Sequence, residues 1–145
     1  MATSDATLSL SSDAEAFAAI ALAAVACDGE LAALEARALR QQLEYRQPYC
    51  RFSDLEMGEL FDRLLQILRQ QGCDALVRQA APLLVQHQRE TALALAADLT
   101  RADHVETRDE QRFLISLAEQ LEIGAERCAQ ILEVIALLNS DSLAG

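Results

Sequence analysis

Apolar residues recur at helical spacing through most of this chain. In one stretch, Leu60, Leu64 and Leu68 form a single stripe that ends at Gly72. No long segment alternates apolar and polar residues as a half-buried strand does. The chain is rich in Ala, Leu, Glu, Gln and Arg, which favour helices, and it has only two prolines. The sequence therefore predicts an all-α bundle of about seven helices.

Capping motifs indicate where several of these helices begin. S-x-x-E boxes open at Ser12 and Ser53, and a T-x-x-E box opens at Thr107. Gly124 is expected to separate the last two helices, and Pro82 to break another because it lacks a backbone N–H. The expected helices cover residues 12–27, 32–45, 53–72, 74–80, 83–102 and 107–123, with a last helix after Gly124.

The length of 145 residues suits a single domain. We expect the domain to span residues 12–139, between a flexible arm at 1–11 and a flexible C-terminus at 140–145. The apolar stretch Ala16–Cys27 is too short to span a bilayer, and acids rather than basic residues precede it. Four widely spaced cysteines without a C-x-x-C pair favour a reducing compartment. We therefore expect a cytoplasmic protein.

Two nine-residue stretches, CDGELAALE at 27–35 and ADHVETRDE at 102–110, share an unusual arrangement of acids. Each has an aspartate in its second position, Asp28 or Asp103, and a glutamate in its ninth, Glu35 or Glu110. The offset is 75 residues for both pairs (103 − 28 and 110 − 35). We interpret this as a helix–turn–helix unit used twice, so the bundle is expected to have two related halves.

The repeated aspartates need an explanation more than the glutamates do. Glu35 and Glu110 are expected in the first turn of a helix, where the helix dipole favours an acid. Asp28 and Asp103 follow the end of a helix, where the dipole disfavours an acid by about 0.3–1 kcal/mol. If a pseudo-twofold axis relates the halves, the four carboxylates would converge on a hard cation such as Ca²⁺, Mg²⁺ or Mn²⁺.

Composition and motif searches exclude several other functions. The formal net charge of −11 disfavours binding to nucleic acid or anionic lipid. The acidic turns do not have the length or glycine position of an EF-hand, and no Glu-x-x-His pair suits a di-iron centre. His87 and His104 are expected to face solvent or cap helices. No phosphate-binding, zinc-protease or serine-hydrolase motif occurs, so we do not expect an enzyme.

The alanine-rich helix leading into C-D-G-E-L-x-x-x-E, and the second turn leading into F-L-x-x-L-A-x-x-L-E-I, resemble the TerB-like family of tellurite-resistance proteins. The resemblance covers about residues 14–138. It implies an all-helical bundle of two related halves, a role in the response to chemical stress, and action together with membrane-associated proteins of a stress complex. It also implies a metal site in the acidic turns, at Asp28, Glu30, Glu35, Asp103 and Glu110, with Gly29 as the turn glycine.

The second turn departs from the family pattern. His104 occupies the place of the turn glycine, and Val105 occupies the place of the acid that matches Glu30. The second half-site therefore has one carboxylate fewer than the first. Two alternatives to a cation-binding sensor or scaffold follow: a metal-free interaction module whose acidic face docks a basic partner, and a helical homodimer whose acids have no such function.

Overall fold

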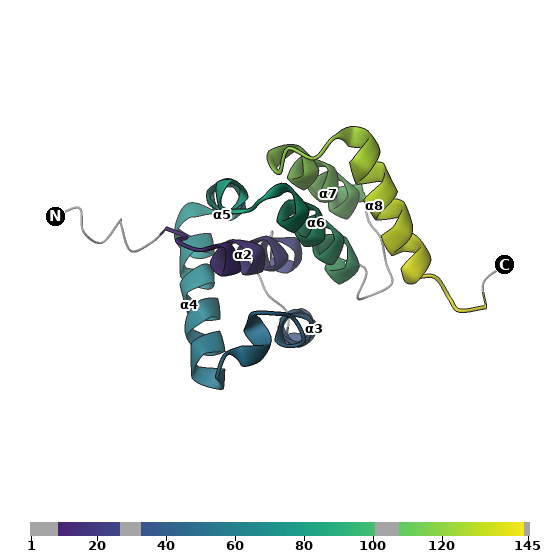
Figure 1. Cartoon of the computed structure of the whole chain (residues 1–145). Coiled ribbons are helices and arrows are strands. Elements are labelled where there is room, and N and C mark those ends of the chain that lie inside the picture. The colour runs from purple at the N-terminus through teal and green to yellow at the C-terminus, as the bar shows by residue number, and fades with distance from the viewer. Residues whose placement is uncertain (1–8, 27–32, 101–107, 144–145) are drawn as a thin grey trace.

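The computed structural model describes residues 9–26, 33–100 and 108–143, without the side chains of residues 33–35 and 109. Within these ranges every regular element is a helix, which confirms the predicted all-α bundle (Figure 1). Two 3₁₀ turns, η1 (Tyr49–Arg51) and η2 (Ala81–Leu83), accompany the α-helices. The α-helices are α2 (Asp13–Ala26), α3 (Ala33–Glu44), α4 (Asp54–Gln71), α5 (Cys73–Ala80), α6 (Gln86–Thr100), α7 (Arg108–Gln120) and α8 (Ala125–Leu138).

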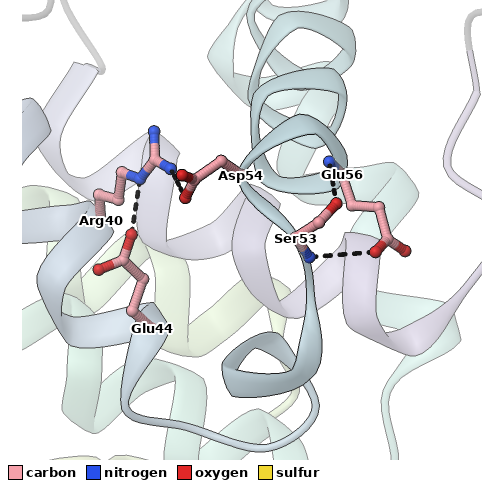
Figure 2. Close-up of polar contacts among 5 residues, drawn as sticks. All are labelled: Arg40, Glu44, Ser53, Asp54 and Glu56. Carbon is pink, nitrogen blue, oxygen red and sulfur yellow. Dashed lines mark hydrogen bonds and ion pairs between the residues drawn. The ribbon is translucent and has the colours of Figure 1, made fainter.

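Helix α4 begins with the complete capping box that the sequence predicts. The Ser53 hydroxyl accepts the Glu56 N–H at 3.1 Å, and the Glu56 carboxylate accepts the Ser53 N–H at 3.0 Å (Figure 2). At the same junction, Arg40 of α3 pairs with Glu44 at 2.7 Å and with Asp54 at 3.1 Å. The hydrogen bond to Glu44 raises the pKa of Arg40. These exposed contacts join the last turns of α3 to the start of α4.

The box at the start of α2 is only half formed. The Ser12 hydroxyl accepts the Glu15 N–H at 3.1 Å, as predicted. The Glu15 carboxylate, however, accepts the N–H of Ser11 at 2.8 Å, because residues 9–11 lie against the bundle. Leu10 is 8% exposed, and its N–H donates to Gln79 of α5. Part of the segment that the sequence groups with the N-terminal arm is thus packed. The third predicted box, at Thr107, lies outside the described residues.

Pro82 ends α5 as expected, but the next helix begins later than predicted. α5 ends at Ala80, and Pro82 lies in η2. Leu84 then takes an extended conformation and is buried, so α6 begins at Gln86 rather than at Leu83. The Gln88 side chain accepts the Val85 N–H at 2.9 Å, which caps this later start.

The core is organised around α2, which packs against α3, α4, α5 and α6 (Figure 1). Most of its buried residues are alanines, and their short side chains let neighbouring helices approach closely. Larger side chains from the surrounding helices fill the remaining space. No polar or charged residue of the described chain is buried. Fully buried large residues include Ile20, Leu22, Leu39, Leu43, Leu64, Ile67, Leu76, Leu93, Leu117 and Leu121.

The connection from α3 to α4 is fixed to the start of α2 by an aromatic residue. Tyr49 is 2% exposed, and its hydroxyl donates to the backbone carbonyl of Ala14. Its ring lies 6.3 Å from that of Phe17 and 5.6 Å from that of Phe52, centroid to centroid. Burial raises the pKa of the Tyr49 phenol. The Gln47–Pro48 peptide bond in this connection is cis.

Candidate functional site

The described residues include only part of the predicted metal site. Asp28, Gly29, Glu30, Asp103, His104 and Val105 all lie outside them. Glu35 lies in α3, but its side chain is not among those described. Glu110 lies in the first turn of α7 and is partly buried, so its charge is at the positive end of the helix dipole, as expected. The ligand set remains a prediction.

The helices on either side of the two acidic turns are spaced alike. α3 begins at Ala33 and α7 at Arg108, which is 75 residues later (108 − 33). The acids of the two turns have the same offset. The helices before the turns, α2 and α6, end at Ala26 and Thr100, 74 residues apart (100 − 26). Each acidic turn is therefore followed and preceded by a helix at nearly the same sequence distance.

One hydrogen bond joins two positions that this offset makes equivalent. The Gln88 side-chain amide of α6 donates to the Asp13 carboxylate of α2 at 3.2 Å, and the residues are 75 positions apart. Around a twofold axis, a residue meets its own equivalent only where it lies close to the axis. The first turns of α2 and α6 therefore meet as the equivalent parts of two related halves would.

A second pair of equivalent positions has similar partners. Glu15 in α2 forms an ion pair with Arg63 of α4 at 3.2 Å. Glu90 in α6, 75 positions later (90 − 15), pairs with Arg127 of α8 at 2.9 Å. The hydrogen bond from Arg127 holds the pKa of Glu90 below its usual value. In each case a glutamate near the start of the central helix binds an arginine of the third helix of its group.

The correspondence between the two groups of helices is incomplete. α4 has 18 residues and α8 has 14, and α5 follows α4 while no described helix follows α8. At equivalent positions of α2 and α6, Ala23 is buried, whereas Asp98 is partly exposed and accepts the Asn139 side-chain amide at 2.8 Å. The second group therefore leaves more of its central helix uncovered by other helices.

Groups of ligating side chains do not occur elsewhere in the described part of the chain. Within it, no three His, Cys, Asp or Glu residues are arranged to hold a metal ion. His87 is exposed in the first turn of α6, in agreement with the sequence interpretation. Cys128 is buried at 7% exposure, and burial raises the pKa of its thiol, so it behaves as a small apolar residue.

Sequence reasoning missed a pocket of about 520 Å³ between the starts of α2 and α6 and the connection at residues 46–49. The Arg46 guanidinium lies 5.7 Å from the Phe17 ring centroid in its wall. The pocket is assembled from three distant parts of the chain, and Tyr49 was the main local signal for it. It lies at the first turn of α2, at the opposite end of that helix from the acidic segment. Its charged and polar lining is Asp13, Arg46, Gln47, His87, Gln88 and Thr91.

Comparison of the chain with protein-family models, with curated proteins and with solved structures gives no match. The TerB-like resemblance therefore remains a prediction from the two acidic turns. Among the described helices, none combines the length and the apolar character needed to cross a membrane.

Proposed function

We propose that this protein is a TerB-like stress-response domain that binds a divalent cation through its two acidic turns and acts as a sensor or scaffold. The proposed ligands are Asp28, Glu35, Asp103 and Glu110, with Glu30 as a further ligand in the first turn. The proposed cation is Ca²⁺, Mg²⁺ or Mn²⁺, because carboxylate oxygens suit hard cations. The proposed role is not enzymatic.

The observation that carries this proposal is the shared 75-residue offset. The acids of the turns have it in the sequence, and the first residues of α3 and α7 have it in the structure. The bond between Asp13 and Gln88 further supports a pseudo-twofold relation between the halves. Such a relation would bring equivalent turns to comparable places around one axis. A cation would then offset the mutual repulsion of the carboxylates.

The test is a thermal melt of chelator-treated protein, repeated with Ca²⁺, Mg²⁺, Mn²⁺ and Zn²⁺. A cation that binds only the native state stabilises it by about 2.7 kcal/mol at a hundredfold excess over Kd. We expect one hard cation to raise the melting temperature of the wild type and to leave Asp28→Asn/Asp103→Asn unchanged.

A matched control separates coordination from general charge. Asp62 in α4 and Asp74 in α5 are exposed, so Asp62→Asn/Asp74→Asn removes the same number of charges without touching the acidic turns. This control should keep the full cation-dependent shift. An equal shift in both double variants, or no shift of the wild type with any of the four cations, would reject the site.

The second candidate is a metal-free module whose acidic face docks a basic partner, such as a membrane-associated protein of a stress complex. The net charge of −11 favours it. Binding of a basic partner that depends on Asp28 and Asp103, and that persists in chelator, would distinguish it from the cation site. A homodimer that survives Asp28→Asn/Asp103→Asn would support the third alternative.

A further inference from the structure

Helix α8 is apolar on two sides, and the bundle covers only one of them. Its inner side contributes Cys128, which is buried, and Ile131, Leu132 and Ile135, which are partly buried against the core. On its outer side, Val134 is 60%, Leu137 69% and Leu138 72% exposed. Spacings of three and four residues place these three side chains on one surface of the helix. We call Val134, Leu137 and Leu138 the outer stripe.

The first half of the chain covers its third helix differently. There α5 packs against both α4 and α2, and it buries Leu76, Val77 and Ala80 in doing so. α8 packs mainly against α6 and α7, and Figure 1 shows it at the edge of the bundle away from α4. In the described part of the chain no helix follows α8. A short amphipathic helix is thus what this fold already uses to cover apolar surface of this kind.

The charges beside the outer stripe are acidic. Glu126, Glu133 and Leu137 are seven and four residues apart, so they form one row along the exposed side of α8. Neither glutamate has an ion-pair partner among the residues that the structure describes. Arg127, the basic residue of α8, is engaged by Glu90. Uncompensated negative charge therefore borders the apolar surface.

This charge decides between two kinds of occupant. In a twofold dimer formed through the outer stripe, Glu126 and Glu133 of one copy would approach the same acids of the other copy. Each copy also carries a net charge of −11, which adds repulsion. A helix with an apolar face bordered by Lys or Arg would instead bury the stripe and pair with both glutamates. The charge pattern thus favours a basic partner over a second copy.

We propose that the outer stripe of α8 is a docking surface for a basic amphipathic helix of a partner protein. The partner's apolar side chains cover Val134, Leu137 and Leu138, and its cationic side chains lie beside Glu126 and Glu133. Burial of aliphatic surface supplies the affinity, and the charges favour this class of partner. This surface is separate from the acidic turns, so the inference does not depend on the cation site.

The test uses full-length protein and three synthetic helical peptides of equal length. The first has a leucine face bordered by lysines, the second replaces the lysines with glutamates, and the third scrambles the first so that no apolar face forms. Fluorescence anisotropy of labelled peptide measures binding. We expect the first peptide to bind at least about tenfold more tightly than either of the others, which corresponds to about 1.4 kcal/mol.

Variants of the protein locate the binding. Val134→Ser/Leu137→Ser/Leu138→Ser should weaken binding of the leucine–lysine peptide at least about tenfold, and Glu126→Lys/Glu133→Lys should weaken it severalfold. The matched control is Glu59→Lys/Asp62→Lys, which makes the same charge change on exposed residues of α4. Its binding should fall much less. Far-UV circular dichroism and melting temperature verify the fold of each variant.

Three results would overturn the inference. Equal binding of the leucine–lysine peptide to wild type and to the triple serine variant would exclude the stripe. An equal loss in the two lysine variants would attribute binding to net charge alone. A wild-type dimer in sedimentation that becomes monomeric in the triple serine variant, with no peptide binding by either protein, would make the stripe an interface between two copies.

Discussion

Helices α4 and α8 are the third helices of their groups, and they use apolar residues in opposite ways. α4 has polar and charged residues on one side and buries Met57, Leu60, Leu64, Ile67 and Leu68 on the other. α8 is apolar around most of its circumference, yet only Cys128 of it is buried. A single apolar stripe is covered completely by one set of neighbours. A helix that is apolar on both sides needs two sets, and the described chain supplies one.

The largest expected difference between the two helices is in the effect of leucine truncation. Leu64 in α4 is fully buried, so Leu64→Ala should lower the free energy of unfolding by about 3 kcal/mol. Leu137 in α8 is 69% exposed, and Leu137→Ala should lower it by less than about 0.5 kcal/mol. Urea denaturation followed by circular dichroism measures both. Similar losses would mean that Leu137 is covered in solution.

The connections leading into α4 and α8 provide a second comparison. Tyr49 is anchored before α4, and Tyr49→Phe should cost about 1–2 kcal/mol because the Ala14 carbonyl loses its buried donor. Tyr45 is 86% exposed in the same connection, so Tyr45→Phe is the matched control and should have little effect. Urea midpoints at pH 8 would show this difference.

The raised pKa of Tyr49 also gives this comparison a pH dependence. Burial favours the neutral phenol in the folded state, so the stabilisation is complete below the unfolded pKa of about 10. It is lost as pH rises above that value toward the folded pKa. The wild type should therefore lose stability above about pH 10 more steeply than Tyr49→Phe. Parallel curves for the two proteins would show that Tyr49 ionises without a penalty.

The smallest expected effects concern the caps of the same two helices. Ser53→Ala removes the capping box of α4 and should cost about 1 kcal/mol. α8 begins at Gly124, which makes no side-chain cap, and a Cβ at this position would meet no neighbour. Gly124→Ser should therefore stabilise the protein by a few tenths of about 1 kcal/mol. Melting temperatures should shift in opposite directions, and a decrease for Gly124→Ser would contradict the comparison.

The helices were predictable because their signals are local. The Ser53 box and the stripe of Leu60, Leu64 and Leu68 lie within one helix, and Pro82 acts on its own turn. The start of α6 was predicted too early because Leu83 continues the apolar pattern. Burial of Leu84 in an extended conformation ends that pattern for a tertiary reason, which the local sequence does not contain.

The functional surfaces were less predictable, for the same reason. The pocket combines Asp13, Arg46 and His87, which are distant in the sequence, and periodicity carries no information about such contacts. Periodicity likewise indicates that α8 is apolar, but it does not indicate which side the other helices cover. The spacing of Asp28 and Asp103 was visible in the sequence. Both residues lie outside the described ranges, so their role as ligands stays a prediction.

The alanine-rich character of α2 has a consequence for how the protein's relatives would be recognised. Because α2 contacts four other helices, a larger side chain at a fully buried position such as Ala19 would force its neighbours apart. Selection there acts on the size of the residue, and alanine is a common amino acid with little diagnostic value. The most constrained segment is therefore among the least distinctive, and distant relatives would share small residues at these positions more than a recognisable sequence.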